Sequence, residues 1–193
     1  MNHFLPAEAC RILEQGGDYN FDDCKILAYR LEGVDEDELR QTCEAATDSY
    51  AREILNWPNG RLAKQEIFEP DTKAAFKDID ACVDHFVGRL QALLESQPSR
   101  ESQPSRMLPI YYQAFVAASK HDTPGQITLV VFHEPQEGQW RADSVACPVR
   151  VELGLTVTSL TMADETVEDV LVKHGTQKHP WFSQSTREIR KGE

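Results

Sequence analysis

The sequence predicts an α+β protein in which a helical half is followed by a small antiparallel sheet and a C-terminal helix. In the first half, apolar residues recur at helical spacing; in the second half, they alternate along short runs that end at turn residues. A Ser/Pro-rich repeat separates the two patterns. We therefore divide the chain into a helical region (1–95), a linker (96–106), a sheet-plus-helix region (107–175) and a tail (176–193).

Four segments of the first half have helical patterning. Residues 6–15 end at Gly16-Gly17 and residues 21–31 end shortly before Gly33, and glycine commonly ends a helix. The segment 35–56 opens with four consecutive acidic residues, and these favour a helix start because they meet the positive end of the helix dipole. The fourth helix is expected to begin after Asp71 or Thr72. Its apolar stripe, at steps of three and four, is Phe76, Ile79, Val83, Phe86, Leu90 and Leu93.

A perfect tandem hexamer, Glu-Ser-Gln-Pro-Ser-Arg, occupies residues 95–106. Pro and Ser at this density disfavour helix and strand, so an exposed linker is expected. A docking motif for a partner is the alternative interpretation. We favour a tolerated duplication, because a loop accepts added residues at little entropic cost.

The period changes to two beyond the linker. Residues 110–118 and 127–132 are rich in aromatic and β-branched residues and flank Pro124-Gly125, which predicts an antiparallel hairpin. A helix is the alternative for residues 110–118. Residues 140–145 form a third predicted strand, and 149–160 are expected to continue the sheet. The spacing of Thr161 and Asp164 resembles a capping box, so a last helix is expected from there to Gly175.

The chain carries 20 basic and 32 acidic residues, which gives a net charge of −12. This negative field repels phosphate backbones and anionic lipid, so direct nucleic-acid binding and membrane binding are not expected. It permits binding to a basic protein, although negative charge also serves solubility alone. No apolar run approaches the ~20 residues of a membrane span, and the N-terminus lacks the pattern of a signal peptide. We expect a cytoplasmic protein.

Five cysteines are present, none of them in a Cys-x-x-Cys pair, and no zinc-ligand spacing occurs. Free thiols in a reducing compartment are therefore expected. The sequence also lacks a phosphate-binding loop, a nucleophile elbow and a His-Glu-x-x-His helix. No metal and no cofactor is predicted.

The weak catalytic candidates are His133, Glu134 and His121. His133-Glu134 closes the strongest predicted strand, and a histidine beside a carboxylate can act as a general base near neutral pH. His121 lies in the hairpin loop, at the opposite end of that strand, so one site is not expected to use both histidines. Another histidine, His85, shares a helix face with Asp78, and we interpret that face as solvated.

The tail is polar and basic, yet it contains two adjacent large aromatic residues. By default these aromatic residues are expected to dock on the protein's own surface. The alternative is that the tail binds another protein, because aromatic and arginine side chains are frequent interface anchors; the candidate partner-binding residues are then Trp181, Phe182, Arg187 and Arg190. The function we expect is that of a non-enzymatic acidic interaction protein, an accessory, inhibitor or immunity-type subunit that binds another protein. The alternative is a small enzyme with a His/carboxylate site on the rim of the sheet.

Overall fold

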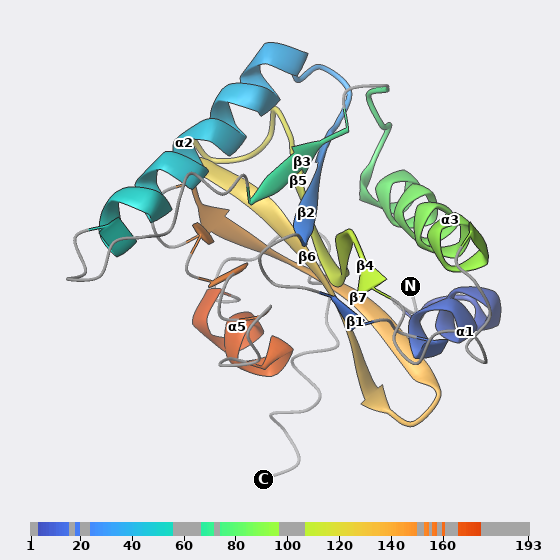
Figure 1. Ribbon diagram of the computed structural model, residues 1–193. Coiled ribbons are helices and arrows are strands. Elements are labelled where there is room, and N and C mark those ends of the chain that lie inside the picture. Colours follow the sequence, from blue (N-terminus) through green and yellow to red (C-terminus); the bar gives the residue numbers. More distant parts are fainter. Residues whose placement is uncertain are drawn as a thin grey trace, which may run out of the picture.

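The computed structural model describes residues 4–15, 18–19, 24–55, 67–71, 74–96, 107–149, 153–154, 156–157, 160 and 166–174. Within these residues the fold is α+β and is built on a mixed five-stranded sheet with strand order β3-β2-β5-β6-β7 (Figure 1). The helices are α1 (Ala7–Gln15), α2 (Glu36–Leu55), α3 (Ile79–Ser96) and α5 (Val167–His174). The strands of the sheet are β2 (Lys25–Arg30), β3 (Phe68–Pro70), β5 (Ile110–Ala118), β6 (Gln126–Gln136) and β7 (Gln139–Pro148).

The sheet is mixed, whereas an antiparallel sheet was expected. β2 lies parallel to both β3 and β5, while β5-β6 and β6-β7 are antiparallel as predicted. Parallel neighbours need a helical crossover, and α2 and α3 supply the two crossovers from β2 through β3 to β5. The helices of the first half therefore cover a sheet instead of forming a helical block. A separate two-stranded parallel sheet joins β1 (Asp18–Tyr19) to β4 (Met107–Leu108).

The prediction of a helix at 21–31 is wrong. Residues 25–30 form β2, which is flanked by strands on both sides, and its residues Ile26 to Tyr29 are buried. A strand buried on both faces has a continuous apolar run, and such a run cannot be distinguished from a short buried helix by periodicity. The tertiary setting decides between the two.

Two further predictions are corrected. The fourth helix begins at Ile79, with Asp78 accepting a hydrogen bond from the amide of Ala81 at 3.0 Å. Phe76, which the spacing assigned to that helix, instead forms an isolated bridge with Leu31 beside β2. In the segment 149–160, the described residues 153–154, 156–157 and 160 are helical rather than strand.

Other predicted elements are confirmed. Helices at 6–15 and 35–56 correspond to α1 and α2, and the hairpin of β5 and β6 is present. The last helix begins after Thr166, whose hydroxyl accepts from the Asp169 amide at 3.2 Å while Asp169 accepts from the Thr166 amide at 3.0 Å. These two hydrogen bonds form a capping box at Thr166. The capping box expected at Thr161 and Asp164 lies outside the described residues, as does Gly175.

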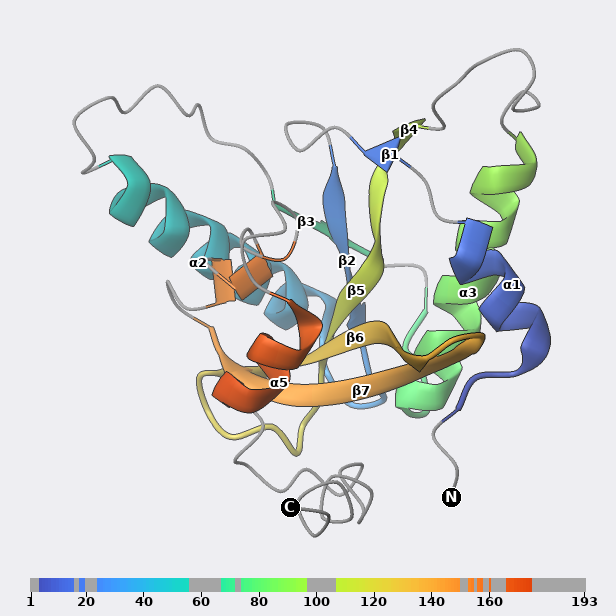
Figure 2. The ribbon, with the colours of Figure 1, turned by 90° about the horizontal axis from the view of Figure 1, so that it is seen from below.

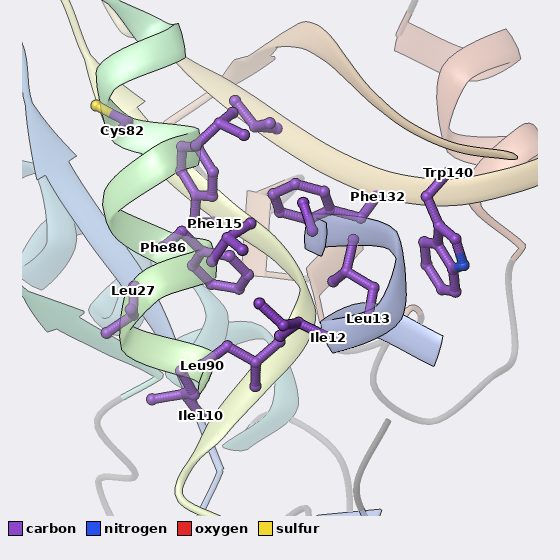
Figure 3. Packing of buried hydrophobic residues seen from close by; sticks show 14 of the residues in the cluster. Ile12, Leu13, Leu27, Cys82, Phe86, Leu90, Ile110, Phe115, Phe132 and Trp140 are labelled. Carbon is purple, nitrogen blue, oxygen red and sulfur yellow. The ribbon is translucent and has the colours of Figure 1, made fainter. Parts of the chain in front are cut away.

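The sheet carries an apolar layer on each face. On one face, α1 and α3 pack against the sheet through a cluster that includes Leu13, Phe86, Phe115 and Phe132 (Figures 2 and 3). The rings of Phe86 and Phe132 stack with centroids 5.0 Å apart. On the other face, α2, α5 and the side chains of Leu153, Val157 and Leu160 cover Ile26, Leu129 and their neighbours. Both segments that flank the predicted linker therefore contribute strands to one sheet.

No helix of the described ranges is both long enough and apolar enough to cross a membrane.

Candidate functional site

His133 lies near the end of β6 and is paired with a carboxylate that the sequence analysis did not select. Its Nε2 is 2.6 Å from Oδ2 of Asp143, on the neighbouring strand β7. The two side chains are 11% and 14% exposed. A carboxylate only accepts hydrogen bonds when ionised, so the imidazole carries a proton on Nε2 and donates it to Asp143.

Arg141 completes a three-residue network. Its guanidinium donates to Oδ1 of Asp143 at 3.1 Å, so both carboxylate oxygens are engaged. Burial alone would raise the pKa of Asp143, but the hydrogen bond from His133 and the charge of Arg141 outweigh it and lower the pKa below its usual value. Asp143 is therefore ionised at neutral pH and holds the imidazole in one orientation. A histidine held in this way is suited to general acid–base chemistry.

The other two predicted catalytic residues do not join this network in the structure. Glu134 is exposed, and its carboxylate accepts from the amide of Gly138 in the β6-β7 turn. His121 is exposed in the β5-β6 loop, where its amide donates to the hydroxyl of Ser119 at 3.1 Å. The expectation that His121 and His133 lie at opposite ends of one strand agrees with the β5-β6 pairing.

A second polar cluster lies where α3 crosses β3. The fully buried Tyr29 places its hydroxyl 3.3 Å from Nδ1 of His85, and Oδ2 of Asp71 is 3.9 Å from the same nitrogen. Burial, with the negative charge of Asp71 second, raises the pKa of Tyr29, so the phenol stays protonated. His85 is exposed, in agreement with the interpretation of its helix face as solvated, and its ring also packs edge-on against Tyr29 with centroids 5.6 Å apart.

The charges of this cluster are paired within it. Nη1 of Arg89 is 3.6 Å from Oδ2 of Asp71. The guanidinium of Arg89 also donates to the carboxylate of Glu69. The Asp71 side chain is only 5% exposed, so its charge depends on such partners. Pairing of this kind joins α3 to the edge strand β3, and we interpret the cluster as structural.

The loops that follow β2 and β3 lead to helices on opposite faces of the sheet, α2 and α3. Parallel sheets commonly bind ligands outside the carboxyl ends of such neighbouring strands, with phosphate at a helix N-terminus. Here the first turn of α2 contains Glu36, Asp37 and Glu38, all exposed. Three carboxylates at that position repel phosphate, which argues against nucleotide binding there.

The exposed side of α2 and the loop before it carry a dense group of acidic residues. We define the α2 acidic face as Glu32, Asp35, Glu36, Asp37, Glu38, Glu44 and Asp48, all of which are exposed. Leu39, Cys43 and Ala46 point the other way and are buried against the sheet. The one basic residue of this stretch, Arg40, is paired with Asp37. Between residues 32 and 48 there are seven acidic residues and one basic residue, hence a net charge of −6, half of the total of −12.

The predicted tail residues Trp181, Phe182, Arg187 and Arg190 lie outside the described residues. In the described part of the chain, no group of three or more His, Cys, Asp or Glu side chains is arranged to hold a metal ion.

Sequence reasoning missed Asp143, Arg141, Tyr29 and Arg89. In a β-hairpin, residues at similar distances before and after the turn lie near each other. His133 and Asp143 are ten residues apart and lie on either side of the β6-β7 turn, so their proximity could have been predicted from the hairpin. No local signal links Tyr29 to His85, which are 56 residues apart and meet only through the β2-to-α3 packing.

Comparisons with protein-family models, with curated protein sequences and with solved structures found no match to this chain.

Proposed function

We propose that this protein is a non-enzymatic acidic interaction protein that binds a basic partner protein through the α2 acidic face. The observation that carries this proposal is the concentration of half the net charge on one exposed helix face and its preceding loop. An accessory, inhibitor or immunity-type subunit is the role that suits such a surface.

The electrostatics of this face favour a cationic partner for two reasons. Like charges held side by side repel one another, and a basic surface relieves that repulsion when it binds. The apolar side of α2 is already buried against the sheet, so the helix can present its carboxylates without exposing the core. Complementary charge of this kind mainly accelerates association and selects the partner.

The basic aromatic tail is the second element of the proposal. Trp181, Phe182, Arg187 and Arg190 would supply the aromatic and arginine anchors that an acidic face lacks. Truncation after Gly175 is then expected to weaken partner binding without removing the charge attraction of α2.

Zero-length carbodiimide cross-linking in native cells tests the proposal. This reagent joins a carboxylate to a lysine only when the two are in contact. We expect links from the α2 acidic face to lysines of one basic protein, in excess over links from Glu8, Glu14 and Asp84. Those three carboxylates are also exposed but lie on α1 and α3, on the opposite face of the sheet. Equal linking of both sets would contradict the proposal.

A second candidate function is that of a small enzyme, and the hydrogen bond between His133 and Asp143 favours it. In that case His133 acts as the general base and Asp143 orients it and stabilises the imidazolium. His133→Ala would then abolish turnover of the substrate in a folded protein, whereas His121→Ala and Glu134→Gln would leave it unchanged. If the interaction proposal is correct, His133→Ala leaves partner binding unchanged.

A further inference from the structure

The N-terminal residues Phe4 and Leu5 lie along the outer edge of β7, next to the His133 network. Phe4 forms an isolated antiparallel bridge with Arg141, and the amide of Leu5 donates to the carbonyl of Trp140 at 2.9 Å. The thiol of Cys10 on α1 donates to the Leu5 carbonyl at 3.5 Å. We call the pair Phe4–Leu5 the N-terminal strap.

Strand pairing places Phe4 in one row with the candidate general base. Arg141 is the register partner of Phe4 on one side and of His133 on the other. Side chains of directly paired residues lie on the same face of a sheet. Phe4, Arg141 and His133 therefore form a row across the edge, with Phe4 outermost.

The ring of Phe4 covers the guanidinium that holds Asp143. The guanidinium carbon of Arg141 is 5.5 Å from the ring centroid, a cation–π contact. Phe4 itself remains 43% exposed, whereas the Arg141 side chain is only 13% exposed. Leu5 is half-buried against the cluster under α1 and α3, so the exposed contact of Phe4 with Arg141 is the weaker attachment of the strap. An exposed cation–π contact contributes only about 0.5–1 kcal/mol, so local opening at Phe4 has a low cost.

We propose that the N-terminal strap controls access to the His133–Asp143 pair, opening to admit small reactive molecules to the imidazole and closing through the Phe4–Arg141 contact. The proposal rests on strap geometry and does not require His133 to be catalytic. When the strap opens, Arg141 loses its aromatic cover and the row next to His133 becomes accessible from the edge of β7.

Histidine acylation by diethyl pyrocarbonate, followed by mass spectrometry of the intact full-length chain and its peptides, tests the proposal. His121 is exposed in a distant loop and serves as an internal reference in the same molecule. If acylation of His133 proceeds from the open strap, its rate follows the opening equilibrium. Loss of an exposed cation–π contact of about 0.5–1 kcal/mol corresponds to about a two- to fivefold change in that equilibrium.

In Phe4→Ala we therefore expect the His133 rate, relative to His121, to rise about two- to fivefold. Phe4→Trp is expected to lower it, because indole gives the strongest cation–π contact. Val172→Ala removes an exposed apolar side chain on α5 and should leave the ratio unchanged. An unchanged ratio in both Phe4 variants, or an equal rise at both histidines, would overturn the proposal. If Phe4→Ala unfolds the protein, Phe4→Trp still tests the proposal, because it enlarges the apolar side chain and does not remove it.

Discussion

The imidazole Nε2 of His133 and the carboxylate of Asp143 form a 2.6 Å hydrogen bond across the β6-β7 hairpin. The register of the hairpin creates this pair, since His133 lies opposite Arg141 and Asp143 lies opposite Val131. Arg141 and His133 therefore approach the same carboxylate, one from its own strand and one diagonally from the neighbouring strand. The arrangement stabilises the exposed end of the hairpin and fixes the tautomer of His133.

The lowered pKa of Asp143 predicts a specific pH dependence of stability. Because its pKa is lower in the folded than in the unfolded protein, the ionised form contributes stability above the unfolded value of about 3.9, and this contribution is lost as the pH falls through the folded value. Asp143→Asn should therefore lower the free energy of unfolding by about 1–3 kcal/mol at pH 7 and by less below about pH 4.

Urea denaturation of both proteins from pH 7 to pH 3 measures this difference. Glu137→Gln, at an exposed position of the same hairpin turn, is the control and should stay within about 0.5 kcal/mol of the parent protein. If the difference in the free energy of unfolding between Asp143→Asn and the parent is the same at every pH, the charge of Asp143 does not cause that difference.

The contact of Arg89 with Asp71 predicts a non-additive mutant cycle. Arg89→Met deprives an aspartate that is 5% exposed of a cationic partner and should cost about 3 kcal/mol of stability. This is the low end of the range for such losses, because Arg89 is itself 31% exposed. The double variant Asp71→Asn/Arg89→Met should regain part of that loss, since no buried charge is left without the guanidinium. Strict additivity in denaturation experiments would mean that the two residues do not interact.

Much of the fold could be predicted where local patterning and tertiary setting agree. α2 has one apolar stripe facing the sheet, and β5 and β6 have a turn signal between them; these elements form as their sequences indicate. β2 could not be predicted, because a strand with neighbours on both sides and helices over both faces has no polar face to reveal its period. The mixed sheet follows from that one element, since β2 supplies both parallel pairings.

The candidate site could be predicted only in part. The sequence indicates His133 because it ends a strong strand, but its neighbour Glu134 points to the turn, and Asp143 on the next strand is the carboxylate that pairs with His133. Adjacent residues of a strand face opposite sides of the sheet, so a sequential His-Glu pair is a poor predictor of a spatial pair. The partners of His85 depend on packing between distant elements and had no local signal.

Gly33 illustrates a local requirement that the sequence does indicate. It follows β2 with a φ of +92°, in the left-handed region that favours glycine. A Cβ atom at this position would lie 2.7 Å from the flexible end of the Lys120 side chain, which is exposed and can move away, so the requirement for glycine comes from the backbone conformation. This turn sets the direction in which α2 leaves the sheet and hence where its acidic face lies.

The central claim, that the α2 acidic face binds a basic protein, is tested most directly by comparing two neutralised variants of equal charge. The face variant is Glu38→Gln/Glu44→Gln/Asp48→Asn, and the control variant is Glu8→Gln/Glu14→Gln/Asp84→Asn. Each removes three exposed carboxylates, so both raise the net charge equally, from −12 to −9. They differ only in the face of the sheet on which the charges lie.

The measurement is quantitative capture of partners from native cells by the tagged full-length parent and both variants, read out by mass spectrometry. We predict a stoichiometric basic partner that the parent and the control variant retain, that the face variant loses, and that the parent releases as salt is raised. Equal retention by the face variant and the control variant would contradict the claim, because binding would then depend on overall charge or on another surface.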